Sequence, residues 1–134
     1  VNNSGLAVLD CINHYKIDVD DILVVVDDIN LSLADIRIRK SGGDGGHNGL
    51  TSIIYHLQSK NFSRLRIGIG NDFQSGNLAE YVLSDFDKKD FMQLENSFNL
   101  SIQLVESFIS DGYNKMLSTF SRLKNLDKLN KESE

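Results

Sequence analysis

The sequence predicts an α/β fold in a single domain. Its 134 residues suffice for one hydrophobic core, and 40% hydrophobic with 25% charged residues is typical of a globular protein. Runs with the two-residue period of strands, or wholly apolar runs, lie at residues 22–26, 35–39 and 65–69. Stretches with the helical period lie before, between and after them. Strands that alternate with helices predict a sheet covered by helices.

The chain opens with a helical pattern. Ser4 stands where its hydroxyl can accept a hydrogen bond from the first turn of a helix. Four apolar residues follow at helical spacing and predict a buried stripe: Val8, Cys11, Ile12 and Tyr15. The single cysteine cannot form an internal disulfide, which fits a reducing cytoplasm. No apolar run is long enough for a membrane span, and residues 1–20 lack the layout of a signal peptide.

Residues 22–26 are consecutive apolar residues that favour strands, which predicts a strand buried on both faces. Asp27 and Asp28 follow this run directly. Ligands of open α/β sheets bind beyond the carboxyl ends of parallel strands, so Asp27 is a candidate site residue. An ordinary strand-ending turn explains the two acids equally well.

Residues 41–50 read SGGDGGHNGL and are the most distinctive stretch of the chain. Glycines let the backbone approach a bound group closely, and the helical pattern that starts here points a helix N-terminus at such a group. His47 and Asn48 add a titratable ring and an amide. A strand-to-helix turn with a solvated His47 is the alternative. The glycine spacing fits neither a P-loop nor a dinucleotide-binding fingerprint, which disfavours a generic nucleotide-binding domain.

Basic residues concentrate around this stretch. Residues 37–66 contain six Lys or Arg and one acid, whereas the other 104 residues contain eight basic and eighteen acidic residues. Arginines from residues 35–39 and 64–69 could meet at one phosphate group, which their forked guanidinium suits. A solvated basic face is the alternative. Three scattered histidines without a Cys/His cluster argue against zinc, so neither a metal nor a cofactor is expected.

The last third of the chain predicts two helices. Ser84 or Asp87 caps a long helix that ends at Gly112, and residues 81–83 suggest a short strand before it. One face of the long helix carries the expected core residues: Phe91, Leu94, Phe98, Ile102, Val105 and Ile109. A second helix follows, and residues 124–134 form a charged tail that is expected to fray.

The block GGDGGHNGL at residues 42–50, followed by RLRIGIG at residues 64–70, closely resembles bacterial peptidyl-tRNA hydrolases. The resemblance spans the chain from Asn2 to about Phe120. It implies a three-layer αβα domain over residues 1–123, with a twisted, mixed and largely parallel sheet of the phosphorylase/hydrolase-like type. It also implies a cytoplasmic monomer that cleaves the ester bond between a peptide and the 3′ end of tRNA.

The resemblance assigns roles to individual residues near the reaction centre. Asp27 matches the aspartate that orients the catalytic base, and His47 matches a catalytic-site histidine that binds the transition state. Asn2 and Asn48 match asparagines that bind the peptide main chain and the reacting carbonyl. Amide side chains suit this task because they donate and accept hydrogen bonds together.

Four arginines are the expected tRNA contacts. Arg39 and Arg66 stand at basic positions that the family uses for the tRNA, and Arg37 and Arg64 stand beside them on the same strands. Peptidyl-tRNA is therefore the expected partner.

The sequence also departs from the family. Asn3 replaces a leucine, and the family segment that carries the first strands and the catalytic histidine has no counterpart in these 134 residues. Loss of a general base typically lowers the rate by about 10²–10⁴-fold, so poor cleavage is expected. Either the sequence is a shortened form of a longer enzyme, or it is a short binding protein. A non-catalytic RNA-binding homologue, such as the family's chloroplast splicing relatives, is the alternative function.

Overall fold

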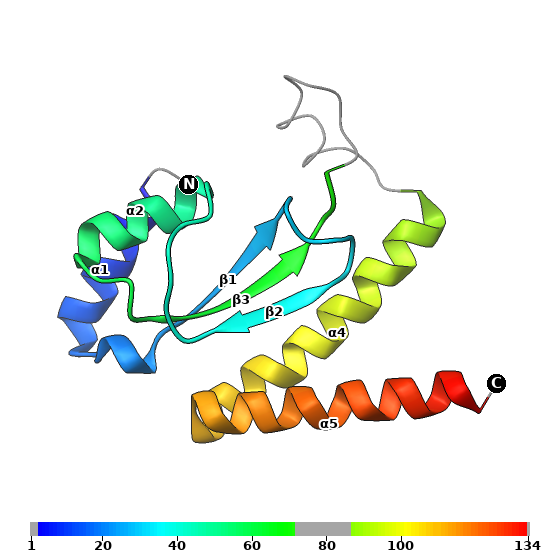
Figure 1. Cartoon of the computed structure of the whole chain (residues 1–134). Helices are drawn as coiled ribbons and strands as arrows, with labels where there is room; N and C mark the ends of the chain where they lie inside the picture. Colours follow the sequence, from blue (N-terminus) through cyan, green and yellow to red (C-terminus); the bar gives the residue numbers. More distant parts are fainter. Residues whose placement is uncertain (1–2, 72–86, 134) are drawn as a thin grey trace. The chain divides into compact units, whose positions relative to one another are not determined.

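The computed structural model describes residues 3–71 and 87–133, and the chain divides into two compact units. Unit 1 comprises Val1–Val24 and Ile38–Leu65, and unit 2 comprises Val25–Arg37 and Arg66–Glu134. The elements follow one another along the chain as shown in Figure 1: α1 (Ser4–Tyr15), the short 3-10 helix η1 (Val19–Asp21), β1 (Leu23–Asp28), β2 (Ile36–Arg39), α2 (Asn48–Leu57), β3 (Ser63–Gly68), α4 (Lys88–Asp111) and α5 (Tyr113–Glu132).

The three described strands form a mixed sheet in the order β1-β3-β2. β1 and β3 are parallel, because Ser63 N–H donates to the carbonyl of Ile22 and Ile69 N–H donates to that of Asp28 with the same offset. β2 runs the other way, as its arrow in Figure 1 shows. The α/β class and the mixed sheet predicted from the sequence are therefore confirmed.

The central strand β3 is buried at every residue except Arg66, which is half-buried. β1, by contrast, has β3 on one side only among the described strands, and Val25 on it is 46% exposed. The prediction that this run is buried on both faces was therefore wrong. The strand also continues through Asp27 and ends at Asp28, so the two acids belong to the strand itself.

In unit 1, α1 packs against α2 through backbone. Gly5 is the only buried residue of α1, and a Cβ at this position would lie 2.0 Å from the carbonyl oxygen of Ser52. The N–H of Gly5 donates to Ser52 Oγ at 3.0 Å. Asn3, and not Ser4, precedes the first helical turn, and it makes no side-chain cap. The predicted apolar stripe of α1 is not a buried face, since Tyr15 is 69% exposed.

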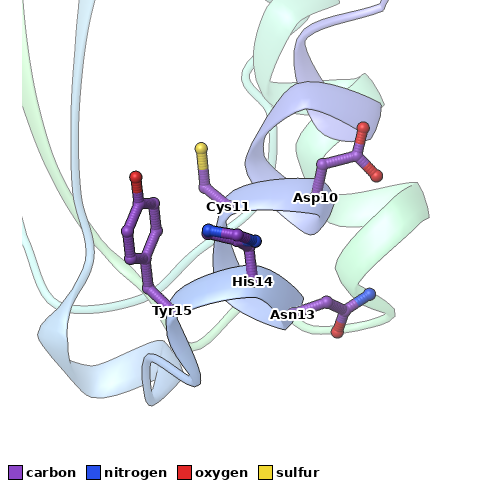
Figure 2. A pocket seen from close by; sticks show the side chains of 5 residues that line it. All are labelled: Asp10, Cys11, Asn13, His14 and Tyr15. Carbon is purple, nitrogen blue, oxygen red and sulfur yellow. The ribbon is translucent and has the colours of Figure 1, made fainter.

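Cys11, expected in the core, is exposed. It lines an open depression of about 620 Å³ on α1 together with Asp10, Asn13, His14 and Tyr15 (Figure 2). The rings of His14 and Tyr15 meet edge to face at 4.6 Å between centroids. All five residues belong to one helix, so the depression is a feature of the α1 surface.

In unit 2, Asp87 caps the start of α4 as predicted, since its carboxylate accepts from Asp90 N–H at 2.8 Å, and Gly112 follows the last residue of the helix. Of the six core residues predicted for α4, only Leu94 is buried. The buried residues are Leu94, Ser97, Ser101 and Leu104, whereas four of the expected core residues are 48–77% exposed: Phe91, Phe98, Ile102 and Ile109.

The helix α5 continues to Glu132, so residues 124–132 are helical where their charge predicted fraying. The ion pair of Lys131 and Asp127, at 3.0 Å and one helical turn apart, supports this end. The expected strand at residues 81–83 and the expected cap Ser84 lie outside the described residues. No helix in the part of the chain that is described has both the length and the apolar character needed to cross a membrane.

Candidate functional site

Residues 41–47, here called the glycine loop, lie between β2 and α2. Gly45 and Gly46 have φ angles of 57° and 80°, a left-handed conformation that residues with a Cβ adopt only at a cost. The two glycines turn the chain into His47, the residue that precedes α2. The sequence prediction of a glycine turn at a helix start is thus confirmed in unit 1.

Asp44 organises this turn. Its Oδ1 accepts from the N–H of Gly46 at 2.9 Å, and its Oδ2 accepts from the hydroxyl of Thr51 at 2.8 Å. Its carbonyl oxygen accepts from the N–H of His47 at 2.9 Å. The bond from Gly46, and after it the bond from Thr51, hold the pKa of Asp44 below its ordinary value of 3.8. The carboxylate therefore ties the loop to the first turn of α2.

His47 is the N-cap of α2. Its ring nitrogen Nδ1 accepts from the N–H of Leu50 at 3.3 Å, and its carbonyl accepts from the N–H of Thr51 at 2.9 Å. A neutral imidazole has one donor and one acceptor nitrogen, so acceptance at Nδ1 places the ring proton on Nε2. The half-buried His47 ring is in this state a hydrogen-bond donor.

Asn48 is the first residue of α2 and is exposed. Helix N-termini carry a partial positive charge, and the Asn48 amide adds a donor and an acceptor at this point. The start of α2 therefore combines the Nε2–H of His47, the Asn48 amide and the helix dipole. Such a group of donors suits a carbonyl oxygen or an oxyanion.

Arg64 supports the glycine loop from β3. Its side chain is fully buried, with Nη1 donating to the carbonyl of Gly43 at 2.8 Å and Nη2 donating to that of Lys60 at 2.7 Å. The guanidinium also lies 4.3 Å from the ring centre of Phe62. A guanidinium that is buried against backbone carbonyls cannot reach a phosphate from solvent. Arg64 was expected to bind tRNA, but in this structure its guanidinium holds the backbone of the glycine loop.

In unit 2, the two acids of β1 differ. Asp28 accepts from Arg66 at 3.4 Å between Oδ2 and Nη1, and from Asn30 N–H at 2.8 Å. Asp27 is exposed, and neighbouring residues of a strand point to opposite faces of the sheet. The Arg66 side chain is 21% exposed and that of Asp28 11%. An RNA phosphate would therefore compete with Asp28 for Arg66.

On β2, Ile36 and Ile38 are buried while Arg37 and Arg39 are exposed, as the alternation predicted. Nη1 of Arg39 donates to the carbonyl of Ile38 at 2.9 Å. The two arginines therefore present positive charge from one face of the strand.

The candidate residues are thus distributed over both units. His47, Asn48, Arg39 and Arg64 belong to unit 1, and Asp27, Arg37 and Arg66 belong to unit 2. Asn2 lies outside the described residues. The sequence interpretation overlooked Asp44 and Thr51. Aspartate bonds readily to the backbone two residues ahead, so Asp44 before two glycines was a usable signal.

Residues 1–129 match the protein family described as peptidyl-tRNA hydrolase. A peptidyl-tRNA hydrolase of Clostridium acetobutylicum is 38% identical over 124 residues, which cover 92% of this chain and 65% of the relative. One of Alkaliphilus oremlandii is 42% identical over 112 residues, covering 84% of this chain and 60% of the relative. The chain thus spans somewhat less than two thirds of these relatives' length.

Solved structures give the same result. The crystal structure of peptidyl-tRNA hydrolase from Acinetobacter baumannii superposes with a TM-score of 0.72 at 28% identity. The match covers 86% of this chain and 60% of that protein. A peptidyl-tRNA hydrolase crystallised with n-propanol gives a TM-score of 0.74 with the same coverage.

Proposed function

Because the chain belongs to the peptidyl-tRNA hydrolase family, we propose that it binds peptidyl-tRNA and that its chemistry is hydrolysis of the ester between peptide and tRNA. The observation that carries the proposal is the start of α2, where His47 caps the helix with Nδ1 and Asn48 follows. We extend to this chain the three-layer αβα arrangement, the cytoplasmic location and the monomeric state that the resemblance implies.

The start of α2 supports a role at the ester carbonyl. Attack of water on an ester carbon places a negative charge on the former carbonyl oxygen, and correctly placed donors stabilise this charge. The Nε2–H of His47 is such a donor, and the N-terminus of α2 adds a partial positive charge. The Asn48 amide would bind a peptide group of the substrate, since it can donate and accept simultaneously. Asn2 is proposed for a similar amide contact.

The geometry of His47 does not suit a general base. In a His–Asp pair the Nδ1–H of the base donates to the carboxylate and Nε2 takes the proton from the nucleophile. In His47 the Nδ1 position is an acceptor for Leu50 N–H, which leaves the proton on Nε2. We therefore propose that these 134 residues by themselves cleave peptidyl-tRNA slowly, and that Asp27 is the carboxylate that orients a general base.

Arg39 and Arg37 are the proposed contacts for tRNA phosphate, because both are exposed on β2. Arg66 in unit 2 is a further proposed phosphate contact, where the phosphate would displace Asp28, whose bond to Arg66 is long at 3.4 Å. Each phosphate neutralised by a lysine or arginine releases counterions, so tRNA binding should weaken as salt concentration rises.

The second candidate function is RNA binding without hydrolysis, which the Nδ1 bond of His47 favours. One experiment separates the two functions. The purified chain is assayed for cleavage of a peptidyl-tRNA and for binding at several salt concentrations, beside a version extended with the N-terminal segment of the Clostridium acetobutylicum relative. Arg39→Gln is compared with Lys131→Gln, which changes an exposed lysine of α5.

We expect the extended version to cleave about 10²–10⁴-fold faster than the short chain, the usual contribution of a general base. Arg39→Gln should weaken binding and lower the salt slope by about 1, and Lys131→Gln should leave both unchanged. Equal cleavage by the two versions would show that the short chain has its own base. Absence of cleavage by both, with binding intact, would favour the RNA-binding function.

A further inference from the structure

The carboxylate of Asp44 is bonded at both oxygens to groups on either side of His47. Oδ1 accepts from Gly46 N–H at 2.9 Å, one residue before His47, and Oδ2 accepts from the Thr51 hydroxyl at 2.8 Å, in the first turn of α2. The side chain of Asp44 thereby bridges the glycine loop and the helix that His47 caps.

The Thr51 hydroxyl has two possible acceptors but only one proton. Its Oγ1 lies 2.8 Å from Asp44 Oδ2 and 3.1 Å from the carbonyl oxygen of His47. An ionised carboxylate is the stronger acceptor, so the proton goes to Asp44. The carbonyl of His47 instead accepts the N–H of Thr51 at 2.9 Å, which is the first hydrogen bond of the helix.

These bonds fix His47 from both ends. Its N–H donates to the carbonyl of Asp44 at 2.9 Å, and its carbonyl is held by Thr51. The ring bond from Nδ1 to Leu50 N–H is long at 3.3 Å, so it depends on the backbone remaining in this position. If the loop relaxed, the ring would lose the contact that selects its tautomer.

We propose that Asp44 is a positioning residue for the reaction, which together with Thr51 keeps His47 at the start of α2 with its proton on Nε2. The proposal rests on the function proposed above, in which His47 Nε2–H binds the substrate. Asp44 acts through His47 and does not itself touch the substrate.

The test uses the full chain with ¹⁵N-labelled histidine and measures the ring nitrogen shifts of His47, which distinguish the two neutral tautomers. Asp44→Ala removes both acceptors, and Thr51→Val removes the hydroxyl while it keeps the side-chain shape. Asp44→Asn and Thr51→Ser each retain a bonding group at the same place. Asp87→Ala is the matched control, because it removes a carboxylate that caps α4 in unit 2.

In the unchanged chain His47 should show the Nε2–H tautomer. Asp44→Ala should give a mixture of tautomers and weaken binding of an N-acetylaminoacyl-tRNA by about three- to tenfold, the effect of one lost hydrogen bond. Thr51→Val should shift the tautomer in the same direction, whereas Asp44→Asn, Thr51→Ser and Asp87→Ala should retain the Nε2–H form. If Asp44→Ala fails to fold, Thr51→Val answers the same question.

An unchanged Nε2–H tautomer in both Asp44→Ala and Thr51→Val would overturn the proposal. So would an equal tautomer shift in Asp87→Ala, because the effect would then reflect general loss of stability. Failure of the proposed function is a separate result: the unchanged chain would then not bind the tRNA at all, while the ring nitrogen shifts would still report on Asp44.

Discussion

The two helix pairs of this chain, α1–α2 in unit 1 and α4–α5 in unit 2, are held by different kinds of contact. In the first pair, Gly5 places its backbone directly on α2, and Ser52 Oγ accepts its N–H. In the second, side chains make the contact, and the hydroxyls of Ser107 and Thr119 lie 2.8 Å apart across the pair. The close approach of the first pair thus requires that residue 5 has no Cβ, whereas the second pair is held by contacts between side chains.

This difference explains which signals the sequence displays. A backbone contact requires one residue type at one place, so the glycine at position 5 is informative by itself. A contact through side chains can be made by several residues, and in α4 small hydroxyl residues share the buried face with leucines. The hydrophobic pattern alone then selects the wrong face.

The largest effect that separates the two faces of α4 is expected from Leu104→Ala. Leu104 is fully buried, and truncation of such a side chain costs about 2–5 kcal/mol of unfolding free energy, through lost burial and the cavity left behind. Ile102→Ala, at a position that is 56% exposed, should cost less than about 0.5 kcal/mol. Urea unfolding of both variants measures this. Similar losses would mean that the apolar stripe of α4 is also buried in solution.

The backbone contact of unit 1 predicts a smaller but still clear effect of Gly5→Ala. Alanine is favoured over glycine within helices by about 1 kcal/mol. Its Cβ, however, would lie 2.0 Å from Ser52 O, a backbone atom that cannot move without its helix. Overpacking of this kind costs about 3 kcal/mol, so a net loss of about 2 kcal/mol is expected.

The matched control for that variant is Gly43→Ala, since a Cβ there meets nothing within 4 Å. Thermal unfolding of the two variants should show a fall in Tm for Gly5→Ala only. A rise in Tm for Gly5→Ala would contradict the close approach of α1 and α2, because the gain in helix propensity would then be the dominant effect.

Much of the fold and part of the site could be predicted from the sequence. The turn at residues 41–47, the start of α2 and the alternation of β2 depend on residues close together in the chain, and all were confirmed. Burial that depends on contacts between residues far apart in the chain could not be predicted in the same way. Arg64 carries a charge that normally indicates an exposed side chain, but the carbonyls of Gly43 and Lys60 bond it inside the protein.

The bridge from Asp44 to Thr51 shows the limit of the sequence interpretation. The two residues are seven positions apart, across a turn whose geometry the glycines permit but do not specify. Only the structure brings the carboxylate and the hydroxyl together. The family resemblance did not indicate this pair either. It assigned roles to residues expected near the substrate and none to the residues that hold the glycine loop.

The smallest expected effect is a pH dependence of the glycine loop in unit 1, which the end of α4 in unit 2 should not show. Hydrogen bonds from Gly46 and Thr51 lower the folded-state pKa of Asp44 below 3.8, so folding favours its ionised form. The resulting stabilisation is fully present above about pH 3.8 and is lost as the pH falls through the lowered pKa. The amide proton shift of Gly46, followed by NMR from pH 6 to pH 2, should therefore change only below about pH 4.

Asp44→Asn should abolish this change in the Gly46 amide shift. The Gly112 amide, which donates to the carbonyl of Phe108, serves as the reference because its acceptor does not titrate. A Gly46 shift that moved mainly above pH 4, or equally in Asp44→Asn, would show that another group controls the loop.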